Sequence, residues 1–358
     1  MEFCTEKIRI CLKLKKAELV SRKLKMNKLL VICGPTATGK TSLALHLAKV
    51  FGGELISADS RQVYKHMDIG TGKEIPKDFG FRNSDLEFKG VEVGYYTDGD
   101  TRIWGYDLVE PKREFSVAQY IKIADDIIKN IWERGKRPIL IGGTGFYIQG
   151  IVDGIPTAQI PKNKKLRNLL KGKKVNELFE ILAQLNPVKS ASMNASDKKN
   201  PRRLIRAIEV ASWRLEVRDG KLDNRTSHFQ LPISTLFIGL TAPKKVLEKK
   251  IERRVDERVR QGIENEIKSR LKEGVSWRMQ SMTSLGYRQW RDFFEGKKGK
   301  DEVINIWKKQ EVNFTKRQIA WFKRDKRINW FDITQRDFQK EVEKLVKKWY
   351  SSNRNGIS

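Results

Sequence analysis

The sequence predicts an α/β protein in which a parallel sheet is flanked by helices, and three observations lead to this prediction. A short apolar run at 29–32 is followed by a glycine-rich loop and then by a helical pattern. Further apolar runs at 54–58, 138–141 and 235–240 alternate with helix-length segments, which is typical of parallel sheets. Residues 161–232 lack a strand pattern, which indicates a mostly helical insertion.

The glycine-rich loop, GPTATGKT, is a P-loop, so the predicted sheet is P-loop NTPase-like. Its spacing supplies two glycines that let backbone N–H groups turn inward, a lysine for phosphate oxygens and a hydroxyl for Mg²⁺. The following helix adds the positive end of its dipole. A glycine-rich turn that binds nothing is the alternative, which the flanking strand and helix disfavour. The expected diphosphate-binding residues are Gly34, Pro35, Thr36, Ala37, Thr38, Gly39, Lys40 and Thr41, with Thr41 as the Mg²⁺ ligand.

The composition of the chain indicates which kind of partner it binds and in which cellular compartment it works. The chain has 358 residues, of which 39% are hydrophobic, and 73 Lys and Arg against 44 Asp and Glu give a net charge of +29. This excess predicts a polyanionic partner, although a solvated basic surface would also explain it. Three cysteines without a Cys-x-x-Cys pair argue against a disulfide framework and a zinc site. No long apolar run is present, so we expect a cytoplasmic protein without a membrane partner.

The first elements place a carboxylate beside the P-loop. Residues 1–27 alternate basic and apolar residues; we expect a disordered extension, with a basic arm that holds nucleic acid as the alternative. The strand at 54–58 then ends in Asp59. A carboxylate at the carboxyl end of a strand lies in the crevice of an open α/β sheet, where it can act as a general base or position a metal. The alternative is an Asp that only caps the turn.

The middle of the core brings a second polar residue to the same crevice. Residues 69–73 are interpreted as a loop near the site, 77–100 as an inserted hairpin, and 101–109 as a strand. A helix follows at 116–134, begun by a serine cap. The strand at 138–141 then runs into GGTGFY, where Thr144 replaces the acidic residue that many NTPases carry. A plain turn with a threonine cap is the alternative.

The remaining segments are basic and helical. Helices are predicted at 164–170, 175–185 and 200–210, and arginines near the start of the last one suit phosphate contact or a solvated face equally. A strand at 235–240 returns the chain to the sheet before charged helices around 253–271. Basic residues and aromatics then interleave, as single-stranded RNA binding requires, although we expect Trp321 to be buried. An amphipathic helix is predicted at 335–349.

Six blocks in this order resemble the tRNA dimethylallyltransferase family, also called isopentenyl-diphosphate:tRNA or IPP transferases. The resemblance covers roughly residues 29–332, and the ordered set is highly specific although each block alone is weak. The blocks are GPTATGKT (34–41), ISADSRQVYKHMDIGTGK (56–73), the strand with GGTGFY (139–147), NPRRLIRAIEV (200–210), GYRQ (286–289) and TKRQIAWFKR (315–324).

The resemblance implies a prenyl transfer. The dimethylallyl group of dimethylallyl diphosphate would pass to N6 of adenosine 37, beside the anticodon of tRNAs reading UNN codons, with release of diphosphate. It further implies Mg²⁺ as cofactor, the tRNA anticodon stem-loop as partner and a monomeric enzyme. Asp59 is the expected general base and Thr144 a second catalytic residue. The expected RNA contacts are Asp59, Ser60, Arg61, Gln62, Thr144, Arg167, Arg202, Arg203, Arg206, Arg254, Gly286, Tyr287, Arg288, Lys316, Arg317 and Gln318. For Arg254, contact with the diphosphate is the alternative.

The same resemblance implies a domain plan. Residues 28–160 form the first part of the P-loop core, 161–232 a helical domain that binds the anticodon arm, 233–345 the return to the core with RNA-binding helices, and 346–358 a disordered tail. The chain departs from the family pattern at the 76–100 insertion, at the Ile103–Tyr106 strand, which is often His-rich, and at Arg258, where Met is usual.

Other function classes remain open at this point. A small-molecule P-loop kinase would use the P-loop and Asp59 equally well, but it would not need the basic insertion. A non-catalytic RNA-binding protein would not need both Asp59 and Thr144. An adenylate prenyltransferase would have no use for the blocks at 200–210 and 315–324.

Overall fold

The computed structural model describes residues 28–88, 90–158, 160–219 and 233–352, and the expected N-terminal extension lies outside them. These residues form two compact units, one of 28–153 with 233–352 and the other of 154–219. The second unit therefore begins earlier than the expected boundary at 161.

The first unit is built on an eight-stranded sheet in the order β3-β4-β5-β2-β6-β1-β7-β8. The pairs among β5, β2, β6, β1, β7 and β8 are parallel, and only β3 and β4 add antiparallel pairs at one edge. The predicted α/β class is thus confirmed. The strands are β1 (Lys28–Cys33), β2 (Gly53–Ser57), β3 (Gly80–Phe88), β4 (Val91–Thr97), β5 (Arg102–Trp104), β6 (Arg137–Gly142), β7 (Ser234–Thr241) and β8 (Ile328–Asp332).

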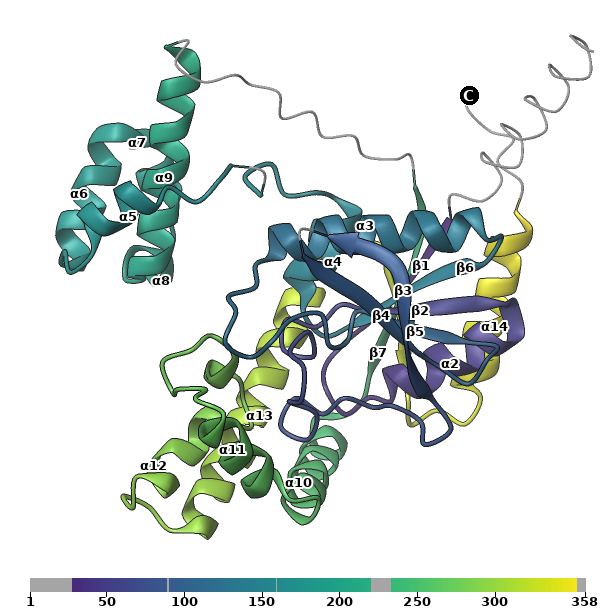
Figure 1. The fold of residues 1–358 in the computed structure, drawn as a ribbon. Coiled ribbons are helices and arrows are strands. Elements are labelled where there is room, and N and C mark those ends of the chain that lie inside the picture. The colour runs from purple at the N-terminus through teal and green to yellow at the C-terminus, as the bar shows by residue number, and fades with distance from the viewer. Residues whose placement is uncertain (1–27, 89, 159, 220–232, 353–358) are drawn as a thin grey trace, which may run out of the picture. The chain divides into compact units, whose positions relative to one another are not determined.

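Helices cover both faces of this sheet (Figure 1). Apolar residues of α3 and α4 pack in one core cluster, and those of α2 and α14 in the other. Helix α3 begins at a capping box in which Ser116 and Gln119 bond each other's backbone N–H. The helices of this unit are α2 (Lys40–Phe51), α3 (Val117–Glu133), α4 (Gly145–Val152), α10 (Lys244–Arg260), α11 (Ile263–Lys272), α12 (Arg291–Phe294), α13 (Lys300–Phe322) and α14 (Phe338–Ser351).

Two local predictions are wrong. The strand expected over 101–109 is limited to Arg102–Trp104, because Gly105 and Asp107 adopt positive φ angles of 88° and 54° and turn the chain out of the sheet. The disordered tail expected from 346 is also incorrect for 346–351, which continue α14. Val346 is fully buried against the sheet, so burial of an apolar face holds this end of the helix.

Among the described residues of the second unit, all regular elements are helices. The predicted helices at 164–170 and 175–185 are confirmed, and the third one extends to Arg218. A separate small core that includes Leu178, Leu182, Leu204 and Ile208 holds the helices together. They are α5 (Lys164–Leu170), α6 (Val175–Leu185), α7 (Pro187–Ser192), α8 (Ala195–Lys198) and α9 (Pro201–Arg218).

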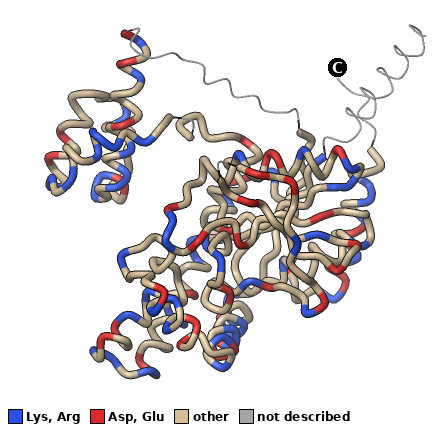
Figure 2. Tube along the Cα trace, viewed as in Figure 1, with Lys and Arg blue, Asp and Glu red and all other residues tan. Residues whose placement is uncertain are grey.

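Basic residues are concentrated along α10 and within the helical unit (Figure 2). Helix α10 has the sequence KKVLEKKIERRVDERVR, in which only Leu247, Ile251, Val255 and Arg258 are buried. In the described part of the chain, no helix is both long and apolar enough to cross a membrane.

Candidate active site

The carboxyl ends of the parallel strands open into a cavity of about 450 Å³. Its walls come from the P-loop, the turn after β2, the loop around Gly72, the loop after β6, and helices α10 and α13. This is the edge at which open α/β sheets bind ligands. The predicted site residues that line it are Thr36, Ala37, Gly39, Lys40, Thr41, Asp59, Ser60, Arg61, Gln62, Thr144, Arg254, Arg288, Arg317 and Gln318.

The P-loop curls back over the start of α2. Gly34 adopts a φ of 133°, and a Cβ there would lie 2.4 Å from the carbonyl oxygen of Leu240, so only glycine fits. Lys40 Nζ donates to the Pro35 carbonyl oxygen at 2.6 Å within the loop. Burial, followed by the nearby Arg254 guanidinium, lowers the pKa of Lys40 to about 8. Lys40 and Arg254 thus place two cations together. Glu74 Oε1 lies 2.8 Å from Arg254 Nη2 and offsets part of this charge, and a bound anion would relieve the remaining repulsion.

Asp59 lies in the turn that follows the carboxyl end of β2, and it lines the same cavity as the P-loop. The Arg61 backbone N–H donates to its Oδ1 at 2.8 Å. Burial raises the pKa of Asp59 above its ordinary value, against the opposing effect of the Arg61 N–H and the cations. The next residue connects it to Thr144, because the Ser60 N–H donates to Thr144 Oγ1 at 3.3 Å. A carboxylate of raised basicity thus adjoins the second predicted catalytic residue.

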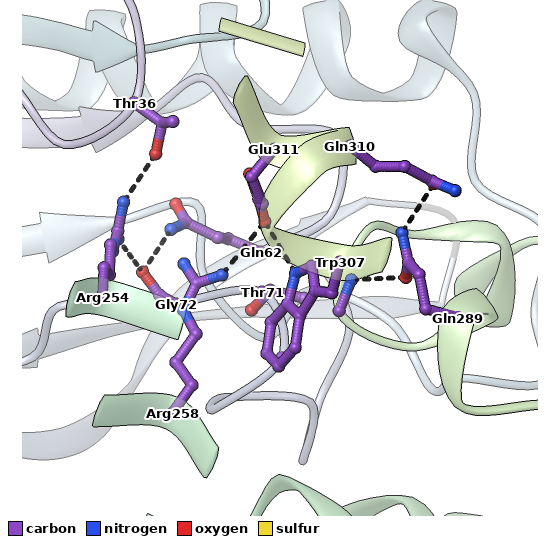
Figure 3. Close-up of polar contacts among 12 residues, drawn as sticks. Thr36, Gln62, Thr71, Gly72, Arg254, Arg258, Gln289, Trp307, Gln310 and Glu311 are labelled. Carbon is purple, nitrogen blue, oxygen red and sulfur yellow. Dashed lines mark hydrogen bonds and ion pairs between the residues drawn. The ribbon is translucent and has the colours of Figure 1, made fainter. Parts of the chain in front are cut away.

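Arg254 and Gln62 meet at a backbone carbonyl that sequence reasoning did not identify. The Gly72 carbonyl oxygen accepts from Arg254 Nη2 at 3.1 Å and from Gln62 Nε2 at 3.0 Å (Figure 3). Arg254 Nη1 also donates to Thr36 Oγ1 of the P-loop at 2.6 Å. Arg254, which we had expected at diphosphate or RNA, therefore joins the P-loop to the Gly72 loop.

A buried ion pair lies beside this contact. Arg258 Nη1 donates to Glu311 Oε1 at 3.3 Å, and Trp307 Nε1 donates to the same oxygen at 3.1 Å (Figure 3). Burial and the neighbouring Arg254 lower the pKa of Arg258 to about 10. Neither Glu311 nor Trp307 was predicted, because the contact joins α10 to α13 over a separation of 53 residues. The only indication of this contact in the sequence was Arg258 itself, which stands where the family usually has Met.

We expect Glu311→Ala to lower the free energy of unfolding by about 3 kcal/mol, since it leaves the Arg258 guanidinium buried without an acceptor. The double variant Arg258→Met/Glu311→Gln removes the ion pair but keeps an acceptor for Trp307. It should be much more stable than the single variant. Urea denaturation checks both values, and equal losses in the two variants would contradict this account.

Helix α13 contributes one residue whose predicted burial is wrong. The Trp321 side chain is 41% exposed and lines the cavity. It packs against Gly145, where a Cβ would lie 2.2 Å from the indole ring. Phe146, 44% exposed, lines the same cavity. Aromatic residues at helical spacing are usually core, but here they leave a face open to a planar ligand.

The other predicted RNA contacts divide into three groups. Tyr287 is fully buried and donates to Glu266 Oε1 at 2.5 Å, so it packs inside the protein. Lys316 is exposed on α13 and does not line the cavity. The residues of the helical unit form a third set, Arg167, Arg202, Arg203 and Arg206, and Gly286 lies beside Tyr287 outside the cavity lining.

Within the helical unit, a carboxylate organises two of the predicted arginines. Arg167 Nε and Nη2 donate to Glu209 at 2.6 and 2.7 Å, and Arg206 Nη1 donates to it at 3.1 Å. Arg206 also donates to the carbonyl oxygens of Thr157 and Ile160. Burial disfavours the charged form, yet these arginines hold the pKa of Glu209 below its ordinary value. Arg202 and Arg203 remain exposed at the start of α9.

Glu209→Ala is expected to destabilise the helical unit by about 2 kcal/mol, because two guanidinium groups lose their carboxylate acceptor. The half-exposed arginines keep contact with water, which limits the loss. Hydrogen exchange of α5 and α9 amides would report the change. The sheet amides serve as the internal control, and a uniform rise in exchange over both units would contradict a local effect.

Mg²⁺ would have Thr41 as its protein ligand. In the described residues, no three His, Cys, Asp or Glu side chains are grouped as a metal site. Thr41 lines the cavity together with Lys40, which suits an ion bound mainly through ligand phosphate oxygens and water. The residues present therefore fit this ion.

The chain is similar to known proteins over most of its length. The IPP transferase family matches residues 100–325, and the Isopentenyl transferase family matches 27–85. A tRNA dimethylallyltransferase of Carboxydothermus hydrogenoformans is 36% identical over 89% of this chain and 96% of its own, and one of Desulfitobacterium hafniense is 32% identical over 90% and 96%. The crystal structure of the tRNA isopentenylpyrophosphate transferase of Bacillus halodurans is 29% identical, with a TM-score of 0.62 over 90% of this chain and 97% of that one. A eukaryotic dimethylallyltransferase, 22% identical with a TM-score of 0.72, shares the fold. By its match over most of its length, the chain belongs to the IPP transferase family.

Proposed function

We propose that this protein transfers the dimethylallyl group of dimethylallyl diphosphate to N6 of adenosine 37 in tRNAs that read UNN codons, and releases diphosphate. The observation that carries the proposal is the shared cavity, which is lined by Lys40 and other P-loop residues and also by Asp59. Family relatives that bear the name tRNA dimethylallyltransferase support it.

The P-loop end suits the leaving diphosphate. Its N–H groups, Lys40 and Arg254 would bind the two phosphate groups, and Thr41 would hold Mg²⁺. When bound, this ion neutralises charge that develops on the leaving oxygen. Fixed cations of this kind lower the barrier because they need no reorganisation as the allylic C–O bond breaks.

Asp59 suits the acceptor side. The lone pair on N6 forms the new C–N bond to the allylic carbon, the C–O electrons leave with diphosphate, and an N6 proton passes to the Asp59 carboxylate. An exocyclic amine is a poor nucleophile, so a positioned base assists the step. Burial raises the pKa of Asp59, which makes it a better proton acceptor. Thr144 would stand between Asp59 and the reacting centre.

Aromatic and basic residues of the cavity suit a nucleobase that has been flipped out of the RNA base stack. Phe146 and Trp321 offer exposed aromatic faces, and Arg288 and Arg317 line the same space. Stacking on aromatics with cations nearby is how proteins hold extruded bases. We expect the arginines of the helical unit to contact the anticodon arm, and the enzyme to act as a cytoplasmic monomer. A small-molecule kinase would have no use for this basic surface.

A labelled transfer assay tests the proposal. The full chain is incubated with Mg²⁺, labelled dimethylallyl diphosphate, and either an anticodon stem-loop carrying the target adenosine or free AMP. We expect label in the stem-loop alone. Label in AMP would indicate an adenylate prenyltransferase, and label in neither acceptor would contradict the proposed reaction.

A further inference from the structure

Gln318 is a buried residue of α13 whose amide joins two separate loops of the cavity. The Thr36 backbone N–H of the P-loop donates to Gln318 Oε1 at 3.0 Å, and Gln318 Nε2 donates to the Gly143 carbonyl oxygen at 2.9 Å. The side chain is only 6% exposed. An N–H group requires the amide oxygen and a carbonyl requires the amide nitrogen, so the partners determine the amide orientation.

The Gly143 backbone is fitted closely to this amide. A Cβ at Gly143 would lie 2.4 Å from Gln318 Nε2, whereas its next contacts would be at 3.6 Å. Trp321, on the next turn of α13, packs against Gly145 in the same manner. Helix α13 therefore contacts the loop on both sides of Thr144, and that loop contacts Ser60 beside Asp59.

The same helix also reaches the other half of the site. Through Thr36 it holds the P-loop, whose Thr36 hydroxyl accepts from Arg254. The two loops that Gln318 joins would carry the leaving group and the acceptor side of the reaction. A change in their separation would move the allylic carbon away from N6, and small errors of alignment cost large factors in rate.

We propose that Gln318 is a positioning residue that sets the distance between the P-loop and the Thr144 loop. The inference rests on the proposed function and replaces the expectation that Gln318 contacts RNA, since both ends of its amide are engaged within the protein. The chemistry passes through other groups; Gln318 acts by holding Thr36 and Gly143.

Gln318→Met keeps the length of the side chain and removes both hydrogen bonds. We expect the Kd for inorganic diphosphate with Mg²⁺ to rise about tenfold and kcat at saturating substrates to fall about tenfold or more, because two buried groups lose their partners. The affinity for the stem-loop should stay within about twofold. Lys316→Met, on the exposed face of α13, is the matched control, which should weaken stem-loop binding and leave diphosphate binding unchanged.

A second pair of variants tests the contact itself. Gly143→Ala forces the Gln318 amide away and should reproduce the loss in kcat. In a Gln318→Ala background the added methyl has space, so Gly143→Ala should cost little more. If Gly143→Ala lowered kcat by the same factor in the wild-type and Gln318→Ala backgrounds, the proposal would be overturned. A Gln318→Met variant that lost only affinity for the stem-loop would overturn it too. Circular dichroism melting confirms that each variant is folded.

Diphosphate binding separates this inference from the proposed reaction. Binding of inorganic diphosphate is measured without any transfer to RNA. The effect of Gln318→Met on the Kd for diphosphate can therefore be measured even if no label enters the stem-loop. Transfer by the wild-type chain with unchanged diphosphate affinity and kcat in Gln318→Met would reject the inference alone.

Discussion

Asp59→Asn is expected to lower kcat by roughly 10²-fold or more, the size of effect that follows loss of a general base. The amide keeps the shape of the side chain and an acceptor for the Arg61 N–H, but it cannot take the N6 proton. Stem-loop affinity should be nearly unchanged. Single-turnover transfer into the stem-loop measures the chemical step, and binding by anisotropy measures the affinity.

The role of Asp59 as a base also predicts in which direction kcat/KM changes with pH. Asp59 acts in its ionised form, and burial raises its pKa. The acidic limb of kcat/KM should therefore fall at a higher pH than it would for an ordinary carboxylate, and Asp59→Asn should remove this limb. Asp126→Asn, at an exposed position on α3, is the control that should leave turnover intact. Equal turnover in the Asp59 variant would take Asp59 out of the catalytic role.

Lys40→Met is expected to reduce kcat/KM for dimethylallyl diphosphate on the order of 10²–10³-fold, comparable with removal of one preorganised donor to a developing anion. The Pro35 carbonyl oxygen accepts from the ammonium group at 2.6 Å and holds it in the P-loop. Without the Lys40 ammonium group, Arg254 would be the remaining cation beside the P-loop. Steady-state kinetics at saturating stem-loop give the value.

Lys40 should also make diphosphate binding pH-dependent. Its pKa in the free protein is lowered to about 8, so below that pH the ammonium is already charged when the ligand arrives. Above it, binding must draw a proton from solvent, and the Kd should rise with pH. Isothermal titration in buffers of different ionisation enthalpy would detect this proton uptake. Lys40→Arg, charged throughout, should abolish it, and a persisting proton uptake would assign the titration to another group.

Much of the fold is local and was predictable for that reason. The P-loop spacing, the apolar strands and the helices at 164–170 and 175–185 depend on neighbouring residues, and each lies where the pattern places it. The end of β5 was missed because two non-strand φ angles follow Trp104, one of them at Asp107. A single sequence carries little signal for such an angle at a residue other than glycine.

The sequence by itself determined the P-loop, the α/β class and the family resemblance, because these depend on spacing along the chain. Only the tertiary structure decided which face of each helix meets the cavity. It placed Trp321 at the cavity wall and Tyr287 in the core, and it brought Arg254 and Gln318 to Thr36. These contacts join residues more than 200 positions apart. Helical periodicity shows which side chains share a face, but the partner of that face is set by packing.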